Sequence, residues 1–410
     1  MNFETLRAGG FDTDALLSPE AALEKFFAHV TLSEPRVERV ELEDAVSRVL
    51  ACEVRADEDY PRANRSAMDG FAVRSSETPG VLRIVGNVRM GAAPHEALAD
   101  MGAMRIPTGG ILPAGADAVV PIEDASVTGP TVRIPLVPPF DAVDQQGSDM
   151  RRGATVLTPG VRLGPAEIGL LATVGIVVVP VFSRPRFGVL SSGDEIVAPE
   201  RAPRPGEVRD SNRYAIGAAL TQMGAESVQL PTASDDLASL ERHMRDGLAH
   251  CDAIVLTGGS SVGERDFTPQ AISRLGSPGV LVHGLRVKPG KPTVFGAAGG
   301  KPVVGLPGNP TSALAILQNV VAPIVRRMSG LAAAPGPFFA TLTSTVRKRA
   351  GWTWFVPVKV ERSLDGAVRA TPLAMRSGHV ALLATADGFA VLGESVVEME
   401  AGSSVNIVLL

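Results

Sequence analysis

The sequence predicts a multidomain α/β protein whose central domain is a mostly parallel sheet covered by helices on both faces, a three-layer α/β/α arrangement. Three observations predict this fold. The 410 residues exceed what one hydrophobic core usually organises. Between residues 184 and 331, near-continuous apolar strands alternate with amphipathic helices, as in parallel sheets buried on both faces. On either side, short apolar runs separated by glycine and proline indicate smaller β-rich units.

The N-terminal part is expected to begin with one amphipathic helix. Ser18 and Pro19 mark its start. Apolar side chains then recur at helical spacing on one face: Leu23, Phe26, Phe27 and Val30. Residues 60–140 carry short apolar runs and no long helix, which predicts a β-rich unit. A helix at 166–174 and a strand at 176–182 follow, before a turn at residues 184–185.

The central domain supplies the candidate binding edge. Strands are expected at 187–190, 228–230, 253–256 and 303–306, and helices at 212–223, 237–248 and 312–328. Parallel sheets bind ligands beyond the carboxyl ends of their strands, so the loops after these strands are the first candidates for a site. Ala333 to Pro337 is typical of a linker, and β-type runs without a convincing helix continue to Leu410, which predicts a small β domain.

Composition excludes several classes of protein. A formal net charge of −5 gives no electrostatic footprint for nucleic acid. Residues 1–10 lack a signal-peptide pattern, and the longest apolar run, residues 170–182, is too short to span a bilayer. Cys52 and Cys251 are far apart in apolar settings, so we expect free thiols in a reducing compartment. These observations predict a cytoplasmic protein without membrane or nucleic-acid partners.

A loop rich in glycine and serine follows the strand at 253–256. Its backbone amides and hydroxyls are suited to cradle a phosphate, and a plain glycine-rich turn is the alternative. The residues expected to bind are Gly258, Gly259, Ser260, Ser261 and Gly263. Asp266 closes the loop as a candidate ligand for a divalent cation bridging phosphates, or as a helix N-cap ahead of Pro269.

Two further loops are expected at the same edge. One joins the strand at 303–306 to a long helix, whose free amide hydrogens and dipole favour an anion; a tight turn capped by Asn309 or Thr311 is the alternative. Its candidate binding residues are Pro307, Gly308, Asn309 and Pro310. The other follows the strand at 187–190 and brings acids and hydroxyls: Ser192, Gly193, Asp194 and Glu195.

Two of the few lysines lie close together in the segment Lys-Pro-Gly-Lys-Pro. Proline and glycine fix this backbone, so Lys288 and Lys291 are candidates to face one anion such as molybdate or a phosphate. Two solvated loop lysines are the alternative for an isolated segment. Outside the central domain, Asp69 and Thr108 stand on glycine-containing turns, where an aspartate is more often a turn residue than a metal ligand.

Taken together, these segments resemble the molybdopterin molybdenumtransferase family, known as MoeA in bacteria and as the C-terminal domain of gephyrin in animals. The resemblance runs from about residue 17 to residue 410. The motifs that carry it occur in the family's order: residues 68–72, 107–109, 192–195, 210–212, 258–266, 288–292 and 305–312. A single motif of this kind is weak, whereas seven in order are specific.

The resemblance implies an elongated homodimer with four domains in each subunit. Residues 1–58 and 142–183 would form a dimerisation domain, and 59–141 an inserted β-rich domain. Residues 184–331 would form the molybdopterin-binding α/β domain, and 332–410 a small C-terminal β-barrel.

The resemblance also implies an activity: molybdate enters the dithiolene of adenylylated molybdopterin with Mg²⁺, and AMP leaves. The upstream adenylyltransferase and downstream cofactor-handling proteins would be partners. The implied active-site residues are Asp69, Thr108, Glu195, Asp266, Lys288 and Lys291, with Asp149 and Asp235 as weaker carry-overs. Within this set, Asp69, Glu195 and Asp266 would place the metal, and the two lysines would hold molybdate.

Two departures from the family pattern stand out. Ser260 occupies a position that is usually valine, which a backbone-lined loop should tolerate. Trp352 and Pro357 stand in a stretch where the family has basic residues. Arg347, Lys348 or Arg349 would have to take the place of those basic residues. Three alternatives share the fold: an adenylyltransferase, which normally consists of the α/β domain alone; a non-catalytic scaffold; and a paralogue specific for tungstate.

Overall fold

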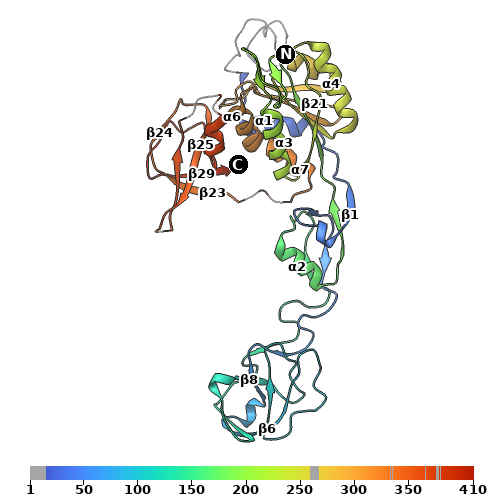
Figure 1. Ribbon diagram of the computed structural model, residues 1–410, viewed down its shortest axis with the longest axis vertical. Coiled ribbons are helices and arrows are strands. Elements are labelled where there is room, and N and C mark those ends of the chain that lie inside the picture. The colour runs from blue at the N-terminus through green and yellow to red at the C-terminus, as the bar shows by residue number, and fades with distance from the viewer. Residues whose placement is uncertain are drawn as a thin grey trace.

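The chain is elongated, with its parts strung along one axis (Figure 1). The computed structural model describes residues 15–258 and 267–410, apart from 333, 335, 365, 375–377 and 379. An α/β unit occupies one end and a β-rich unit the other, with a smaller unit around helix α2 (Pro165–Thr173) between them. The C-terminal β unit lies beside the α/β unit. Among the described residues, no helix is both long and apolar enough to cross a membrane.

The central sheet has six strands, and the first four of its order are parallel to one another. The fifth is antiparallel to both neighbours. In spatial order the strands are β17 (Glu226–Gln229), β14 (Arg186–Ser191), β18 (Ala253–Thr257), β22 (Lys301–Leu306), β21 (Val294–Ala298) and β19 (Pro278–His283). The predicted, mostly parallel sheet is therefore confirmed.

Helices cover both faces of this sheet, because buried side chains alternate along each strand. Phe187 and Val189 face one core, which includes residues of α1 (Pro19–His29) and α3 (Asn212–Gln222). Leu190 faces a second core with α4 (Leu237–His250) and α5 (Thr268–Leu275). Each fully buried side chain of this size contributes about 1.5–3 kcal/mol. The three-layer arrangement is thus confirmed.

The predicted helix at 312–328 is broken into three parts. They are α6 (Pro310–Ile316), a π-helical segment (Leu317–Val321) and α7 (Ala322–Met328). Pro323 has no amide hydrogen, and its ring collides with the carbonyl four residues earlier in a regular α-helix. The wider π turn avoids that collision.

The predicted helix at 19–30 is confirmed, and the Ser18 Oγ accepts from the Ala21 amide at 3.1 Å.

The unit around α2 is built on a small antiparallel sheet. Its order is β1 (Val37–Glu41), β13 (Val178–Phe182) and β2 (Val49–Leu50). A 3₁₀ turn follows β1, and α2 packs near it to enclose a core that includes Leu163 and Leu171. Two strand pairs lead away towards the β-rich unit: β3 (Val54–Arg55) with β12 (Thr155–Leu157), and β4 (Arg65–Ser66) with β11 (Val143–Asp144).

The β-rich unit is a six-stranded sheet with cores on both faces. Phe71 belongs to one core and Ala72 to the other, as expected for neighbouring residues of a strand. Its helical elements are 3₁₀ turns at Ser75–Glu77 and Ile122–Asp124. In order, the strands are β8 (Ala118–Pro121), β5 (Gly70–Val73), β7 (Gly102–Ile106), β6 (Gly80–Asn87), β10 (Thr131–Ile134) and β9 (Ser126–Thr128).

The C-terminal unit is a closed five-stranded barrel, as the resemblance implied. Its order is β25 (Thr353–Arg362), β26 (Val368–Pro372), β23 (Phe338–Leu342), β29 (Ser404–Leu409) and β27 (Gly388–Leu392), and β27 pairs back onto β25. A further pair is β24 (Val346–Arg347) with β28 (Glu398–Met399). The expectation of no helix here was wrong: α8 (Val380–Thr385) is one, and it is too short for helical spacing to reveal it.

Candidate functional site

The carboxyl ends of β14, β18 and β22 converge on one edge of the central sheet. The Ser192 amide donates to the Thr257 carbonyl at 2.9 Å, and the Asn212 Nδ2 donates to both the Thr257 Oγ1 at 3.0 Å and the Gly308 carbonyl at 2.8 Å. Gly258 has a φ of +94°, and a Cβ there would lie 1.9 Å from the Ser192 carbonyl oxygen. Only glycine permits this approach, so three loops that are distant in sequence form one surface.

Several polar groups buried at this edge have no hydrogen-bond partner among the described residues. They are the Ser191 Oγ, Asn212 Oδ1, Asn309 Oδ1 and Thr311 Oγ1. A buried polar atom without a partner costs about 1–3 kcal/mol, so such atoms are retained where a ligand can use them. Asn309 occupies the N-cap position of α6 but its side chain makes no capping bond, which argues against a purely structural role for the loop.

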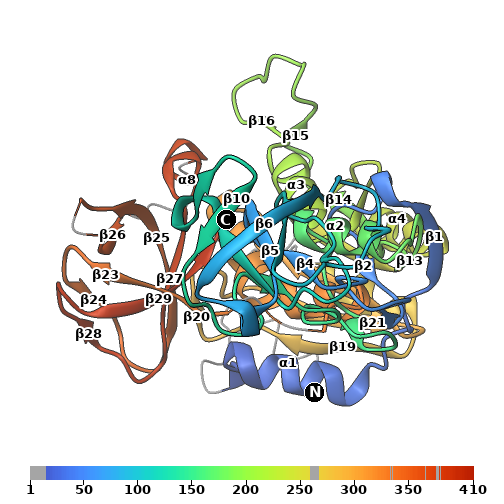
Figure 2. The same ribbon diagram turned by 90° about the horizontal axis from the view of Figure 1, so that it is seen from below.

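Acidic side chains gather on the loop after β14. The Ser192 Oγ donates to the Asp235 Oδ1 at 3.1 Å, and the Asp235 amide donates to the Asp194 Oδ1 at 3.2 Å. Glu195 is exposed, and its carboxylate lies against Gly193, where a Cβ would be 2.6 Å from the Glu195 Oε2. The edge is therefore acidic on the β14 side. A short parallel pair follows, β15 (Ile196–Val197) with β16 (Val208–Arg209), and this segment projects outward (Figure 2).

Lys288 and Lys291 lie at the same edge, for a reason that follows from the register. His283 at the end of β19 pairs with Val294 at the start of β21, and Val294 pairs with Gly305 near the end of β22. The connection that carries both lysines therefore leaves and re-enters the sheet beside the carboxyl end of β22. The Leu285 amide donates to the Lys291 carbonyl at 2.8 Å, which closes this connection on itself.

The C-terminal barrel borders the edge. Strand β20 (Val287–Lys288) pairs with β25, and the Lys288 Nζ lies 4.2 Å from the centroid of the Trp354 ring. A Cβ added to Gly378 would stand 3.8 Å from the Asn309 Nδ2, so a second segment of the barrel unit also reaches the loops.

Two of the three basic residues considered as substitutes in the barrel are engaged elsewhere. The Lys348 Nζ donates to the Trp352 carbonyl at 2.6 Å, and burial lowers the pKa of this lysine. Arg347 pairs with Glu398 at 2.9 Å. Arg349 is exposed and has no ion pair among the described residues. The barrel residue that contacts a predicted site residue is instead Trp354, which the sequence did not single out.

Asp69 and Thr108 form a separate acid–hydroxyl pair in the β-rich unit. The Asp69 Oδ1 accepts from the Thr108 amide at 2.6 Å and from the Thr108 Oγ1 at 2.9 Å. These bonds, the amide first, hold the pKa of the exposed Asp69 carboxyl below its usual value because they favour the ionised form. The pair lies in the unit at the opposite end of the chain from the central sheet (Figure 1).

The predicted site residues thus fall into three groups. At the sheet edge are Ser192, Gly193, Asp194, Glu195, Asp235, Gly258, Lys288, Lys291, Pro307, Gly308, Asn309 and Pro310. Asp69 and Thr108 are remote in the same chain, and Asp149 lies on the connection between units, where its amide donates to the Tyr60 carbonyl at 3.1 Å. Gly259, Ser260, Ser261, Gly263 and Asp266 lie outside the described residues.

The remoteness of Asp69 limits what one chain can bind. Within the described ranges, no three His, Cys, Asp or Glu side chains come together in a way that would hold a metal ion. No binding role was predicted for Asn212, whose side chain joins two of the loops, and Thr311 was predicted only as an alternative cap. The signal for Asn212 was its place at the first turn of a helix that faces the edge.

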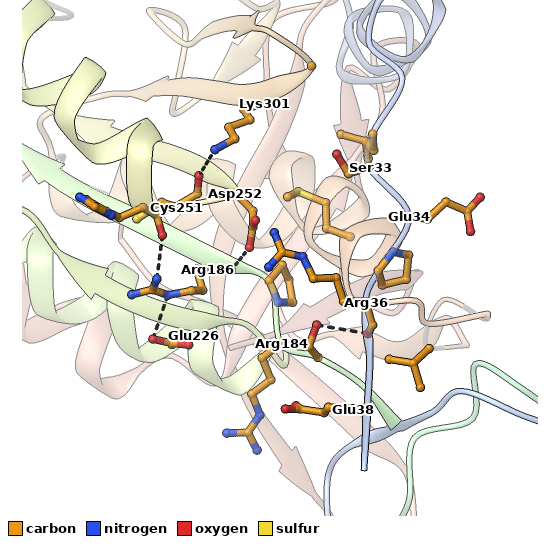
Figure 3. Close-up of a pocket in the computed structure, with 18 of the residues that line it drawn as sticks. Ser33, Glu34, Arg36, Glu38, Arg184, Arg186, Glu226, Cys251, Asp252 and Lys301 are labelled. Carbon is orange, nitrogen blue, oxygen red and sulfur yellow. Dashed lines mark hydrogen bonds and ion pairs between the residues drawn. The ribbon is translucent and has the colours of Figure 1, made fainter. Parts of the chain in front are cut away.

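A separate cavity of about 740 Å³ opens at the amino ends of the strands, where the α/β unit meets the unit around α2 (Figure 3). Two of its cations are engaged: Arg186 contacts Glu226 at 3.2 Å and the His250 carbonyl at 2.8 Å, and Lys301 donates to the Cys251 carbonyl at 3.0 Å. These bonds satisfy carbonyls at the end of α4. The cavity is at the opposite edge of the sheet from the candidate site.

Comparison with known proteins covers nearly the whole chain. Residues 17–175 match the MoeA N-terminal region (domain I and II), residues 188–327 a probable molybdopterin-binding domain, and residues 340–410 the MoeA C-terminal region (domain IV).

Individual relatives agree with these matches. A molybdopterin molybdenumtransferase of Bacillus subtilis is 32% identical over 388 residues, 91% of this chain and 90% of that protein. Molybdopterin molybdenumtransferase 2 of Mycobacterium tuberculosis is 32% identical over 385 residues, 90% of this chain and 94% of that protein. A crystal structure of the MoeA protein from Pyrococcus horikoshii is 34% identical with a TM-score of 0.76, covering 96% of this chain and 99% of that one.

We predict that Gly258→Ala destabilises the protein far more than Gly206→Ala. Both glycines have nearly the same φ, +94° and +93°, but a Cβ at Gly206 meets nothing within 4 Å. Gly206→Ala should therefore cost about 1 kcal/mol from backbone strain alone. Gly258→Ala adds the collision with the Ser192 carbonyl, for a total of roughly 2–4 kcal/mol in the free energy of unfolding. Equal losses in denaturant titrations would show that the close approach of the two loops is unimportant.

We also predict that Thr108→Val raises the pKa of Asp69 while leaving it below the usual value, because the amide bond of residue 108 remains. Thr108→Ser keeps both bonds and should leave the pKa unchanged. The stabilisation from these bonds is present above the ordinary pKa of an aspartate and is lost as pH falls through the lowered one. Carbon-13 NMR of labelled aspartate carboxyls, assigned with Asp69→Asn, measures the shift. An unchanged pKa in Thr108→Val would contradict the role of the hydroxyl.

Proposed function

This chain belongs to the molybdopterin molybdenumtransferase family, and we propose that it inserts molybdate into adenylylated molybdopterin with release of AMP. The observation that carries the proposal is the sheet edge where three loops, unpartnered buried polar groups and two lysines converge. A pterin bearing phosphates needs both kinds of group: amide and hydroxyl donors for its polar ring and cations for its anionic parts.

The two lysines suit the oxyanion. A lysine ammonium presents three donors and no acceptor, and it attracts an anion as a compact charge. Lys288 is exposed at the edge, and Lys291 lies three residues further on in the same closed connection. We assign molybdate to this pair. The pterin and its phosphates then belong on the neighbouring surface formed by Ser192, Gly258 and the loop after β22.

Carboxylates suit a magnesium ion, which prefers oxygen ligands. The proposed ligands are Asp69, Glu195 and Asp266. Asp69 accepts both bonds from Thr108 with the same carboxylate oxygen, Oδ1, and these bonds favour the ionised form of the group. When bound, the ion would supply neutralisation of the phosphoanhydride charge. For Asp69, the chain's own contribution is the pair of bonds from Thr108, which favour the ionised carboxylate.

A homodimer reconciles the position of Asp69 with this assignment. In one chain, Asp69 and Thr108 lie at the far end from the sheet edge (Figure 1). We propose that the β-rich unit of one subunit completes the site of the other. Apolar side chains exposed on the unit around α2 support such an association: Val46 is 49% exposed and Val177 is 63% exposed. The domain boundaries predicted from the sequence belong to the same proposal.

The alternatives are less well supported. An adenylyltransferase normally consists of the α/β domain alone, whereas this chain matches family models for the regions before and after it as well. A pure scaffold has no need for buried unpartnered polar atoms at the edge or for an exposed lysine such as Lys288 there. AMP release measured with molybdate and with tungstate distinguishes a tungstate-specific paralogue. We further propose cytoplasmic action, where the free thiols of Cys52 and Cys251 stay reduced, and contacts with the enzymes before and after it in cofactor assembly.

The proposed function predicts AMP release from adenylylated molybdopterin that requires magnesium and either molybdate or tungstate. Replacing Lys288 and Lys291 together by alanine should raise the half-saturating oxyanion concentration about tenfold or more, because charge-assisted hydrogen bonds are lost. The half-saturating concentration of the pterin should change much less. Lys25→Ala, at an exposed lysine on α1, is the matched control. Equal losses for both ligands would place the lysines on the pterin phosphates, and no AMP release by the wild type would reject the function.

The proposed dimer predicts complementation between two variants that each impair AMP release at low molybdate concentration. Asp69→Ala and Lys288→Ala subunits, carrying different affinity tags, are co-produced and the mixed dimers purified through both tags. If each site draws on both subunits, one site of the mixed dimer is intact, and its activity should be about half that of the wild type. A dimer of wild type with the Asp69→Ala/Lys288→Ala double variant has a mutation in each site and should show only the low activity of the single variants. The reverse result in these two mixed dimers is the outcome that rejects a shared site.

A further inference from the structure

The Lys288 ammonium lies over an aromatic ring of the C-terminal barrel, 4.2 Å from the centroid of Trp354. We propose that Trp354 is a positioning residue that holds Lys288 ready for the incoming oxyanion. The proposal rests on the function proposed above, since it assumes that Lys288 binds molybdate. It assigns the barrel an aromatic contribution to the site.

The backbone fixes the two side chains side by side. In the parallel pairing of β20 with β25, Lys288 is the partner of Trp354, and paired residues project to the same face of a sheet. On its other side, β25 pairs with β27, where Trp354 is opposite Leu392. Trp354 is half-buried and packs against the barrel core. The ring therefore belongs to a rigid element, and the lysine side chain rests on it.

A second set of contacts holds the connection that carries Lys288 against the barrel. The Thr353 amide donates to the Arg286 carbonyl at 2.9 Å, and Arg286 pairs with Glu394 at 3.2 Å. The Gly351 amide donates to the Glu394 carbonyl at 3.0 Å. These bonds flank the Lys288–Trp354 contact on the barrel side. Lys288 therefore lies where the connection between β19 and β21 is hydrogen-bonded to the barrel.

An aromatic ring positions a lysine without neutralising it. Among the described residues, no carboxylate pairs with Lys288, whereas Lys359 pairs with Asp387 at 2.8 Å and Lys348 is bonded to a carbonyl. A carboxylate would compete with the oxyanion for the ammonium, but a ring attracts the cation through its face and leaves the three N–H donors free. Holding a flexible side chain in place beforehand also reduces the entropy lost when the anion binds.

Substitution of Trp354 tests the proposal, with Trp352 as the matched control. Trp352 is half-buried in the same segment, and its backbone carbonyl accepts from the Lys348 Nζ. Trp354→Leu should raise the half-saturating molybdate concentration about two- to fivefold, the range expected for a cation–π contact. Trp354→Phe should give a smaller rise. The half-saturating pterin concentration should stay near the wild-type value in both Trp354 variants. In Trp352→Phe, the half-saturating molybdate concentration should also stay near the wild-type value. A fall in turnover at saturating molybdate with no change in its half-saturating concentration would indicate a merely structural role and overturn the proposal.

Fluorinated tryptophan separates ring electrostatics from ring shape. The chain has two tryptophans, so Trp352→Phe leaves Trp354 as the single site of incorporation. Each added fluorine weakens the attraction of the ring for a cation while changing its volume little. The half-saturating molybdate concentration should rise stepwise with fluorine number. A flat series, or a falling one in which the ring competes with the anion, overturns the proposal.

Fluorescence of the Trp352→Phe protein gives a readout that does not depend on activity. Adding Lys288→Met to this protein should change the emission of Trp354 in the absence of any ligand. Sodium molybdate alone should change the emission of the Trp352→Phe protein, which keeps Lys288, but not that of the Lys288→Met variant. Lys25→Met is the control and should behave as its parent. If emission responds in this way but no variant or wild type releases AMP, the proposed function fails while the positioning role stands. If emission is indifferent to Lys288→Met, the positioning role itself is overturned.

Discussion

The parallel pairing of β14, β18 and β22 is the constraint on which the rest of the structure depends. Residues 187–191 pair in register with 253–257, and 254–257 with 303–306. Because the three strands run in one direction and in this register, their loops leave the sheet at the same height. That is why the Gly258 backbone meets the Ser192 carbonyl and why Asn212 reaches two loops at once. A slip of one residue in any of these strands would move its side chains to the opposite face and into the wrong hydrophobic core.

The sequence was sufficient for the central sheet because strands buried on both faces are nearly continuous apolar runs, as in residues 253–256. It was also sufficient for the loops of the edge, since their place follows from topology. It failed where the cause is a single residue or a distant contact. Pro323 divides the long helix, and α8 is too short to show a period. The contact between Lys288 and Trp354 depends on a pairing between β20 and β25 that no local pattern announces.

The acidic and basic parts of the edge are held by different elements. Asp194, Asp235 and Ser192 form a hydrogen-bonded group on the β14 side, whereas the lysines belong to the connection between β19 and β21. The strand order places these two groups on either side of β18 and β22. Opposite charges are thereby kept apart across the polar surface and do not cancel each other, so a bound anion and a bound cation can both be accommodated.

The β-rich unit has a further consequence through the way it joins the chain. It is entered and left through neighbouring strands, with β3 paired to β12 and β4 paired to β11. The whole unit is therefore equivalent to one long surface insertion, whose two ends are held together by the paired strands. Closure of such a loop costs little more as it lengthens, so a self-contained sheet with its own cores is tolerated there without weakening the fold around it. The α/β unit and the unit around α2 keep their own cores, and the β-rich sheet adds to them as a self-contained insertion.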